Sequence, residues 1–155
     1  MSPPRKSARA SAPLSLKIQI DGAARGNPGP AGAGAILSDS RGKRLKELAV
    51  YLGEATNNVA ESCALILALQ EALHLNGRRV SVFTDSELLA RQVTGVYRVK
   101  DKQLQWLHAL IRNLTGAFDR FEIRHVPREE NRPADRLANR AVNEGLRGQM
   151  TLFSD

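Results

Sequence analysis

The segment "IDGAARGNPGPAGAGAIL", residues 20–37, is the stretch that decides the fold. It continues an alternating run in which Leu16, Ile18 and Ile20 share one face, as on a β-strand with one buried side. The run ends in Asp21 and passes into glycines and prolines, which favour a tight turn. Small residues after the turn predict a second strand that a neighbouring element can approach closely. Hairpin geometry alone would explain the glycines; the other interpretation is that Asp21 holds a multiply charged group.

Strand and helix patterns alternate along the rest of the chain. After a turn at residues 41–43, the segment "RLKELAVYLG" predicts a third strand that pairs back on the second. We expect two more strands and four helices, the strands at residues 80–85 and 118–126 and the helices at residues 57–76, 86–94, 101–113 and 131–145. This order implies an α/β fold with a mixed five-stranded sheet, a three-stranded antiparallel meander plus parallel strands, flanked by helices.

Local signals predict how these helices begin, end and face the core. Asn58 and Glu61 have the spacing of a capping box at the start of the first helix. Asn131 is expected to cap the last helix and Gly145 to end it. Trp106 falls on the apolar stripe of the third helix, so we expect its side chain in the core.

Composition indicates one globular domain that favours an anionic partner. The 155 residues carry 23 Lys and Arg against 16 Asp and Glu, a net charge of +7 that favours nucleic acid, although a merely soluble basic protein has the same balance. A single cysteine, Cys63, rules out an internal disulfide and suits a reducing compartment. Residues 1–15 lack the apolar region of a signal peptide and are expected to form a disordered basic tail. We expect the functional domain at residues 16–146, a C-terminal tail at 147–155, and a cytoplasmic monomer.

Four carboxylates stand at the ends of the predicted elements. Asp21 and Asp85 end strands, while Glu61 opens the first helix. Asp135 lies in the first turn of the last helix. Each residue alone has an ordinary interpretation as a turn or cap residue. Together they are expected to gather at one edge of the sheet, where they would repel one another unless a cation neutralised them, and oxygen ligands without a Cys or His cluster favour Mg²⁺ or Mn²⁺.

Four blocks of the sequence resemble the signature blocks of the type 1 ribonuclease H family. The resemblance runs from Leu16 to Gly145, and its blocks are residues 20–37, 56–69, 83–93 and 125–141. It implies the ribonuclease H-like fold and endonucleolytic cleavage of the RNA strand of RNA–DNA hybrids, leaving 5′-phosphate and 3′-hydroxyl ends. It also implies two Mg²⁺ or Mn²⁺ ions in one site, held by Asp21, Glu61, Asp85 and Asp135.

The same resemblance implies individual roles within the site. Asp21 would bridge both ions, and Asp135 would hold the ion that activates the attacking water. Glu61 and Asp85 would hold the ion at the leaving 3′ oxygen. Asn27 and Asn57 resemble family residues that face the hybrid, and Thr56 resembles the residue that holds a phosphate of the DNA strand. Polar groups beside the carboxylates are candidates to contact the 2′-hydroxyl that separates RNA from DNA: the backbone around Gly22, Asn58, Glu61 and the segment Ser86–Glu87.

Basic residues between the second and third helices are candidates for further phosphate contacts. Arg98 and Lys100 lie in "YRVKDKQLQW", residues 97–106, an abbreviated form of a basic segment found in some family members. Phosphate contacts would make binding salt-dependent. A solvated surface run is an equally good interpretation of these charges.

The sequence departs from many family members just before the last carboxylate. Those members carry a mobile histidine in a longer loop, thought to assist water attack or product release. His125 precedes Asp135, but the residues around it alternate as in a strand, and we therefore expect a strand position for it. Arg128 is the better candidate for a catalytic cationic assistant.

The C-terminal segment "QMTLF", residues 149–153, resembles the short peptide with which bacterial replication proteins dock on the sliding clamp. The alternative is that Leu152 and Phe153 fold back onto the core. Retention by purified clamp of the full chain, but not of a chain that ends at Gly148, would support docking.

Two other functional interpretations stay open at this stage. One is a catalytically silent nucleic-acid-binding module on the same fold, although the presence of all four carboxylates argues against it. The other is a nuclease that also cuts double-stranded RNA, as members with a short loop before the last carboxylate could do.

Overall fold

The computed structural model describes the backbone of residues 13–153 and the side chains of residues 13–148. Its elements follow the predicted order, with a short 3₁₀ helix added before the last α-helix. They are β1 (Leu14–Ala24), β2 (Gly29–Asp39), β3 (Arg44–Ala55), α2 (Asn57–His74), β4 (Gly77–Thr84), α3 (Glu87–Val93), α4 (Lys102–Thr115), β5 (Arg120–His125), η1 (Arg128–Glu130) and α5 (Arg132–Phe153).

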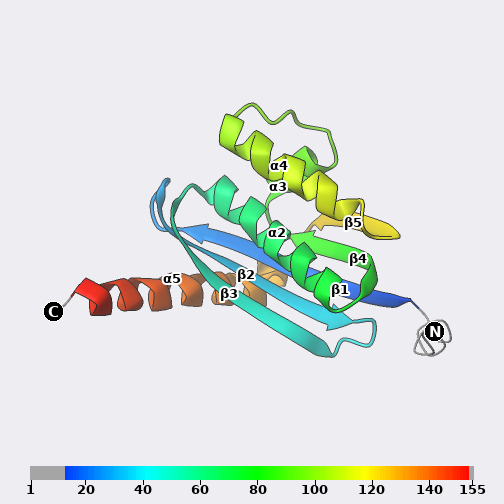
Figure 1. Ribbon diagram of the computed structural model, residues 1–155, viewed down its shortest axis with the longest axis horizontal. Helices are drawn as coiled ribbons and strands as arrows, with labels where there is room; N and C mark the ends of the chain where they lie inside the picture. The colour runs from blue at the N-terminus through cyan, green and yellow to red at the C-terminus, as the bar shows by residue number, and fades with distance from the viewer. Residues whose placement is uncertain (1–12, 154–155) are drawn as a thin grey trace, which may run out of the picture.

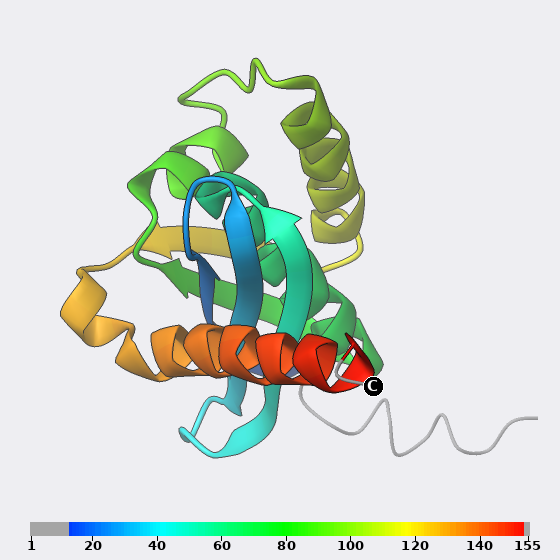
Figure 2. The ribbon, with the colours of Figure 1, turned by 90° about the vertical axis from the view of Figure 1, so that its left-hand side faces the viewer.

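A mixed five-stranded sheet forms the centre of the molecule, as predicted. The strand order is β3-β2-β1-β4-β5, in which β1, β2 and β3 form the antiparallel meander while β4 runs parallel to both β1 and β5. Figure 1 shows α2, α3 and α4 on one face of the sheet and α5 along the other, and Figure 2 shows α5 crossing the strands of the meander. At the β3 edge, register shifts leave Leu45 and Leu52 without partners on β2.

The core lies between the sheet and α2, on the face that the sequence predicts for β1. Leu16, Ile18 and Ile20 are buried there against Leu65 and Leu69 of α2. Full burial of an aliphatic side chain of this size contributes about 1.5–3 kcal/mol to folding.

Glycine lets α5 lie directly on the opposite face of the sheet. A Cβ atom at Gly34 of β2 would lie 2.5 Å from the Ala134 carbonyl oxygen and 2.6 Å from the Ala138 nitrogen, both in the backbone of α5. The close approach that the small residues of β2 predict is therefore confirmed.

Three expectations about helix ends are wrong. Thr56 caps α2 by accepting a hydrogen bond from the Val59 N–H at 3.2 Å, so Asn58 and Glu61 do not form a capping box. Asn131 lies at the cap position, where its carbonyl oxygen accepts from the Asp135 N–H at 3.1 Å, but its side chain does not cap α5, because its Oδ1 accepts no hydrogen bond from the described residues. Gly145 does not end α5, which continues to Phe153.

Gly145 has a packing role inside the helix. A Cβ atom at this position would overlap the ring of Tyr51 on β3. The glycine therefore admits an aromatic ring against the helix instead of stopping the helix.

Trp106 is not in the core, which corrects the expectation from the apolar stripe. Its side chain is 72% exposed, while α4 buries Leu104, His108 and Ile111. A helix turns by about 100° per residue, so Trp106 points away from the face that carries Leu104. Leu110 is exposed on the same outer side.

The predicted N-terminal tail lies almost wholly in residues 1–12, outside the described residues. The segment expected to dock on the sliding clamp has a helical backbone at the end of α5, but its side chains also lie outside the described part. Among the helices described, none is both long and apolar enough to cross a membrane.

Candidate active site

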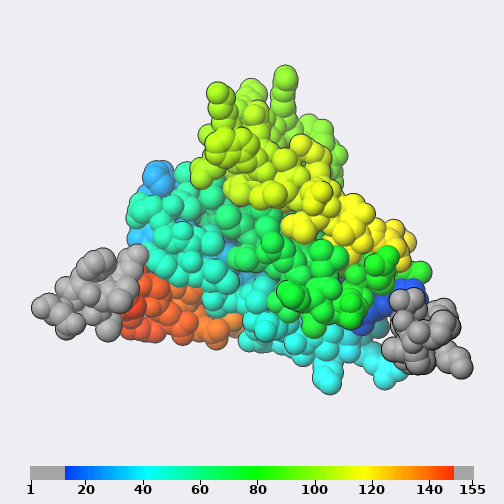
Figure 3. All heavy atoms as spheres, viewed as in Figure 1, coloured from blue at the N-terminus to red at the C-terminus, as the bar shows by residue number. Residues whose placement is uncertain are grey.

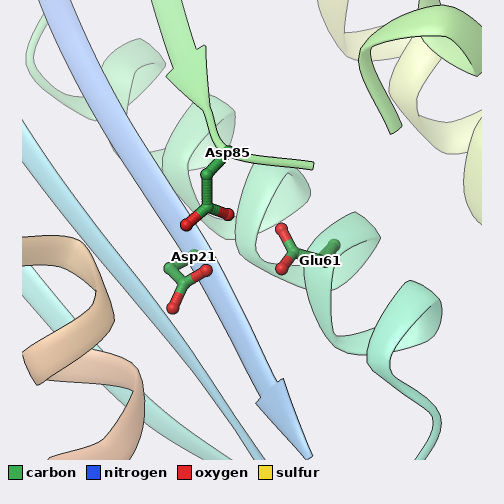
Figure 4. A group of neighbouring side chains, drawn as sticks. All are labelled: Asp21, Glu61 and Asp85. Atoms are coloured by element: carbon green, nitrogen blue, oxygen red, sulfur yellow. The ribbon is translucent and has the colours of Figure 1, made fainter. Parts of the chain in front are cut away.

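Three carboxylates from separate elements meet at one edge of the sheet (Figure 4). Asp21 lies on β1, Glu61 on α2 and Asp85 directly after β4, and carboxylate oxygens of the three lie within 4.8 Å of one another. Asp21 is 4% exposed and Glu61 8% exposed, whereas Asp85 is half-buried. Three acids are thus held together with little water to separate their charges.

The sheet register and one glycine bring these carboxylates together. Ile20 of β1 pairs with Thr84 of β4 in parallel, so the next residue in each strand lies at the same edge. Gly22 lies against the start of α2, where a Cβ atom would overlap the backbone of Ala60 and Glu61. The absence of that Cβ allows α2 to place the Glu61 carboxylate over the end of β1.

Burial and mutual repulsion raise the pKa values of the cluster. Burial raises the pKa of Asp21 to about 10, and the negative charges of Glu61 and Asp85 add to the rise. Burial, followed by the charge of Asp85, raises the pKa of Glu61 to about 8. Burial also raises the pKa of Asp85, although the positive charge of Arg128 partly offsets it. The cluster therefore retains protons near neutral pH unless a cation replaces them.

These residues fit a hard divalent cation. They offer only carboxylate oxygens, the ligands that Mg²⁺ and Mn²⁺ prefer. The Oε2 atom of Glu61 is buried and has no hydrogen-bond partner within the described part of the chain. An unpaired buried acceptor costs about 1–3 kcal/mol, a cost that a bound cation would remove.

A cavity of about 410 Å³ opens beside the cluster and brings most of the predicted site together. It is lined by Gly22, Ala23, Ala24, Arg25, Asn57, Glu61, Asp85, Arg128, Asp135 and Asn139. Asp135 thus joins the site from the first turn of α5, on the opposite face of the sheet from α2.

Asn27 and Asn57 connect the β1–β2 turn to the start of α2. The Asn57 N–H donates to Oδ1 of Asn27 at 2.9 Å, and Oδ1 of Asn57 accepts from the Ala24 N–H at 3.1 Å. Both asparagines are exposed, and Asn57 lines the cavity. The two residues therefore fix the shape of the loop beside the carboxylates.

The other predicted substrate residues near the cluster also have structural partners. Thr56 caps α2, as described above, and Ser86 caps α3 by accepting from the Leu89 N–H at 3.1 Å. The Asn58 side chain donates to Gln92 of α3 at 3.4 Å, while its Oδ1 is buried without a hydrogen-bond partner in the described chain. The sequence does not single out Gln92, whose role depends on this contact between helices.

Arg98 and Lys100 lie apart from the cavity. Both are exposed in the segment between α3 and α4, which Figure 3 shows standing out from the body of the molecule. The structure therefore does not bring them to the carboxylates, and any phosphate contact they make is remote from the cluster.

The residues before α5 lie as the sequence predicts. His125 is the last residue of β5, is exposed, and pairs with Thr84 of β4, which confirms its strand position. Arg128 lies in η1, lines the cavity and is close enough to Asp85 to act on its pKa. Arg128 thus lies beside the cluster, in a cavity that Arg25 also lines, while His125 lies in the sheet.

Asn131 is a site residue that sequence reasoning assigns wrongly. It is fully buried, and its side-chain amide donates to the Ile20 carbonyl oxygen at 2.8 Å, joining η1 and α5 to the end of β1. A hydrogen bond from the same side chain also counteracts the rise in the pKa of Asp85. Its Oδ1 is buried and has no partner among the described residues. The partner lies far away in the chain, so the local sequence signals only a helix cap.

Asn131→Ala is expected to lower the free energy of unfolding by about 1–3 kcal/mol, because it leaves the buried Ile20 carbonyl unpaired. It should also weaken Mn²⁺ binding, because Asp21 and Asp85 lose a shared anchor. Urea unfolding and calorimetric titration of folded protein with Mn²⁺ measure the two effects. Asn143→Ala, on the exposed side of α5, is the matched control, and equal behaviour of the two variants would refute the anchoring role.

Comparison with known sequences finds one family model and several similar proteins. Residues 19–141 match the family model described as "Reverse transcriptase-like". The chain is 41% identical over 125 residues to ribonuclease HI of Halobacterium salinarum, covering 81% of this chain and 63% of the relative. It is 40% identical over 131 residues to a bifunctional protein of Mycobacterium tuberculosis, covering 84% of this chain and 36% of that relative. The chain thus spans less than two thirds of the length of either relative.

Solved structures share the fold closely. LC11-RNase H1, solved in complex with an RNA/DNA hybrid, has a TM-score of 0.80 at 43% identity, covering 84% of this chain and 99% of that chain. The N-terminal ribonuclease H domain of the mycobacterial bifunctional protein has a TM-score of 0.84 at 38% identity, covering 88% and 99%. The sheet, its helices and the carboxylate cluster thus define a ribonuclease H-like domain. The chain belongs to the type 1 ribonuclease H family.

Proposed function

We propose that the protein is an endonuclease that hydrolyses the RNA strand of RNA–DNA hybrids with the help of two divalent ions. The observation that carries the proposal is the buried cluster of Asp21, Glu61 and Asp85, whose carboxylate oxygens lie within 4.8 Å of one another beside a cavity that Asp135 also lines. The likeness to LC11-RNase H1, solved with an RNA/DNA hybrid, supports the choice of substrate.

Asp21, Glu61, Asp85 and Asp135 would share the binding of the two ions. Bound Mg²⁺ or Mn²⁺ would supply activation of water and stabilisation of charge on the leaving 3′ oxygen. Asp21, which interacts with Glu61, Asp85 and Asp135, would help to hold both ions. Asp135 would help to hold the ion on the water side, and Glu61 and Asp85 the ion on the leaving-group side. The products are a 5′-phosphate and a 3′-hydroxyl, and no covalent intermediate with the protein forms.

Selection of RNA over DNA rests on the 2′-hydroxyl, which differs between the two strands. The backbone at Gly22, which lines the cavity, would contact the 2′-hydroxyl together with Asn58, one turn before Glu61 in α2, and Ser86, the residue after Asp85. Asn27 in the β1–β2 turn would hold the hybrid together with Thr56 and Asn57 at the start of α2. Arg98 and Lys100 would add remote phosphate contacts.

A panel of labelled substrates tests the proposal. RNA–DNA hybrid, double-stranded RNA and duplex DNA are each incubated with the protein and Mg²⁺ or Mn²⁺. Cleavage of the RNA strand of the hybrid, with intact duplex DNA, is the expected result. Cleavage of double-stranded RNA at a similar rate would broaden the substrate class, whereas tight hybrid binding without cleavage would favour a silent binding module and overturn the proposal.

Arg128→Ala is expected to lower the turnover of hybrid cleavage about tenfold or more, because it removes the cation that acts on Asp85. His125→Ala should have a smaller effect, because His125 is held in β5. Single-turnover cleavage of hybrid by the two variants measures the difference. The opposite ranking would reject Arg128 as the assisting residue.

Two further proposals concern a protein partner and the oligomeric state and location of the protein. Residues 149–153 would dock on the sliding clamp, and the protein would act as a cytoplasmic monomer. Fourteen residues of helix separate Asp135 from Gln149, the first residue of this segment, or about 21 Å at 1.5 Å per residue. Docking at that end of α5 would therefore leave the cavity open to the hybrid.

A further inference from the structure

A second cavity adjoins the carboxylate site on the side of α5. Its volume is about 280 Å³, and it is lined by Arg128, Glu129, Arg132, Asp135 and Arg136. It shares Arg128 and Asp135 with the cavity of the carboxylate cluster, so the two lie side by side. A strand that lies over Asp135 therefore meets the three arginines next.

Arg132 and Arg136 carry positive charge that no ion pair among the described residues neutralises, whereas Arg128 acts on Asp85. Arg128, Arg132 and Arg136 are exposed, and within the described residues none of them has an ion pair within 4.0 Å. Further along α5 the situation differs, because Arg140 pairs with Glu144 at 3.8 Å. Arg44, which lines the next hollow with Arg140, pairs with Glu47 at 2.8 Å.

The position of the charges also opposes the stability of the helix. Arg132 is the first residue of α5 and Arg136 follows one turn later. Positive charge near a helix N-terminus is unfavourable because of the helix dipole, by about 0.3–1 kcal/mol. An acidic residue would therefore stabilise the helix better at position 132, so a ligand outside the chain is a better explanation of Arg132.

We propose that Arg132 and Arg136 bind the phosphate backbone of the cleaved RNA strand where it extends beyond the carboxylate site. This inference rests on the proposed function for the identity of the strand. The two side chains start about 6 Å apart along the helix, since they are one turn apart. They would therefore follow consecutive phosphates rather than clamp one anion. We call Arg132 and Arg136 the arginine track. It ends where the next arginines, Arg140 and Arg44, are paired with acids.

The test compares two double variants that lose the same charge. Arg132→Gln/Arg136→Gln removes the track, and Arg41→Gln/Lys43→Gln removes two exposed cations from the β2–β3 turn, remote from the cavities. Arg128 is left intact because it belongs to the proposed catalytic site. The substrates are a short blunt hybrid and hybrids whose RNA strand continues as a single strand at either end.

On an extended hybrid the track variant should raise KM roughly tenfold at low salt and leave kcat unchanged. The slope of log KM against log salt should fall by about 1.4, or 0.7 for each of two lost phosphate contacts on a single strand. KM on the blunt hybrid should change little, the turn variant should retain the wild-type slope, and thermal unfolding should show no loss of stability. Equal KM for the two double variants on extended hybrids, or an equal rise on blunt hybrid, would overturn the track.

Failure of the track and failure of the proposed function are distinguishable. If the wild-type protein cuts no hybrid, the proposed function fails. Binding of single-stranded RNA of increasing length, followed by fluorescence anisotropy, then still tests the arginines. A loss of affinity in the track variant but not in the turn variant would support them, and equal affinity would refute them.

Discussion

Asp21→Asn should reduce hybrid cleavage by about a thousandfold or more, because it removes the carboxylate at the centre of the cluster and with it the ion sites. Asparagine has the same shape, so the sheet and the cavity should persist. Cleavage of labelled hybrid in Mg²⁺ and in Mn²⁺ measures the loss, and circular dichroism checks the fold. Glu54→Gln, an exposed change on β3, is the control that should retain activity. Substantial cleavage by a folded Asp21→Asn protein would mean that the carboxylate cluster is not the active site.

The same variant should be more stable than the wild type when no metal is present. The raised pKa of Glu61 means that the folded protein binds more protons than the unfolded chain between pH 4.5 and about 8. The raised pKa of Asp21 acts in the same direction. Stability of the metal-free wild type should therefore fall as pH rises through this window.

Removing one carboxylate from the cluster should reduce this loss of stability at high pH. At the upper end of the window we expect Asp21→Asn to gain on the order of 1–4 kcal/mol over the wild type, and near pH 4 almost nothing. Each 1 kcal/mol corresponds to about 2–4 °C in Tm for a protein of this size. Thermal unfolding in chelator at several pH values measures the difference. A gain that does not depend on pH, or one that Glu54→Gln shows equally, would contradict the electrostatic explanation.

Gly22→Ala should damage both the fold and the site. The new methyl group would overlap the backbone of Ala60 and Glu61, so α2 must move away from β1. Overpacking of this kind costs about 1–3 kcal/mol, and a displacement of about 1 Å in a catalytic group can cost a hundredfold in rate. We therefore expect a lower urea midpoint together with a loss of hybrid cleavage of about a hundredfold.

Gly116→Ala is the matched control for this change. A Cβ atom at Gly116 would lie 3.6 Å from the nearest atom, which is an ordinary contact. Its stability and activity should stay close to those of the wild type. If Gly22→Ala cleaved hybrid as the wild type does, the close contact between β1 and α2 would not be needed to position Glu61.

The sequence predicted the parts of the fold that depend on short-range patterns. Alternation at residues 16–20 predicted the buried face of β1, and carboxylates at element ends predicted which side chains would meet at one edge of the sheet. Both signals follow from backbone geometry, because a strand alternates its side chains and parallel strands end together. The family resemblance supplied the expected chemistry of the site.

The errors concern residues whose partners lie far away in the chain. Asn131 looked like a helix cap, but its amide bonds the Ile20 carbonyl, 111 residues away. Gly145 looked like a helix end, but its missing side chain makes room for Tyr51. Trp106 was placed by periodicity on the wrong side of α4, because Leu104, His108 and Ile111 define the buried face instead. No local sequence pattern distinguishes these roles from those of a helix cap, a helix end or a core side chain.

The shape of β3 has a consequence for how copies of the protein behave when crowded together. This strand of 12 residues lies at the rim of the sheet, where an incoming strand from another copy could add to the open row of amides and carbonyls. The bulges at Leu45 and Leu52 break that row near both ends, and the exposed charges of Arg44, Lys46 and Glu54 surround it. Both features disfavour the addition of strands from other copies and so the growth of fibres. They do so although the outer edge of β3 has no neighbouring strand among the described residues.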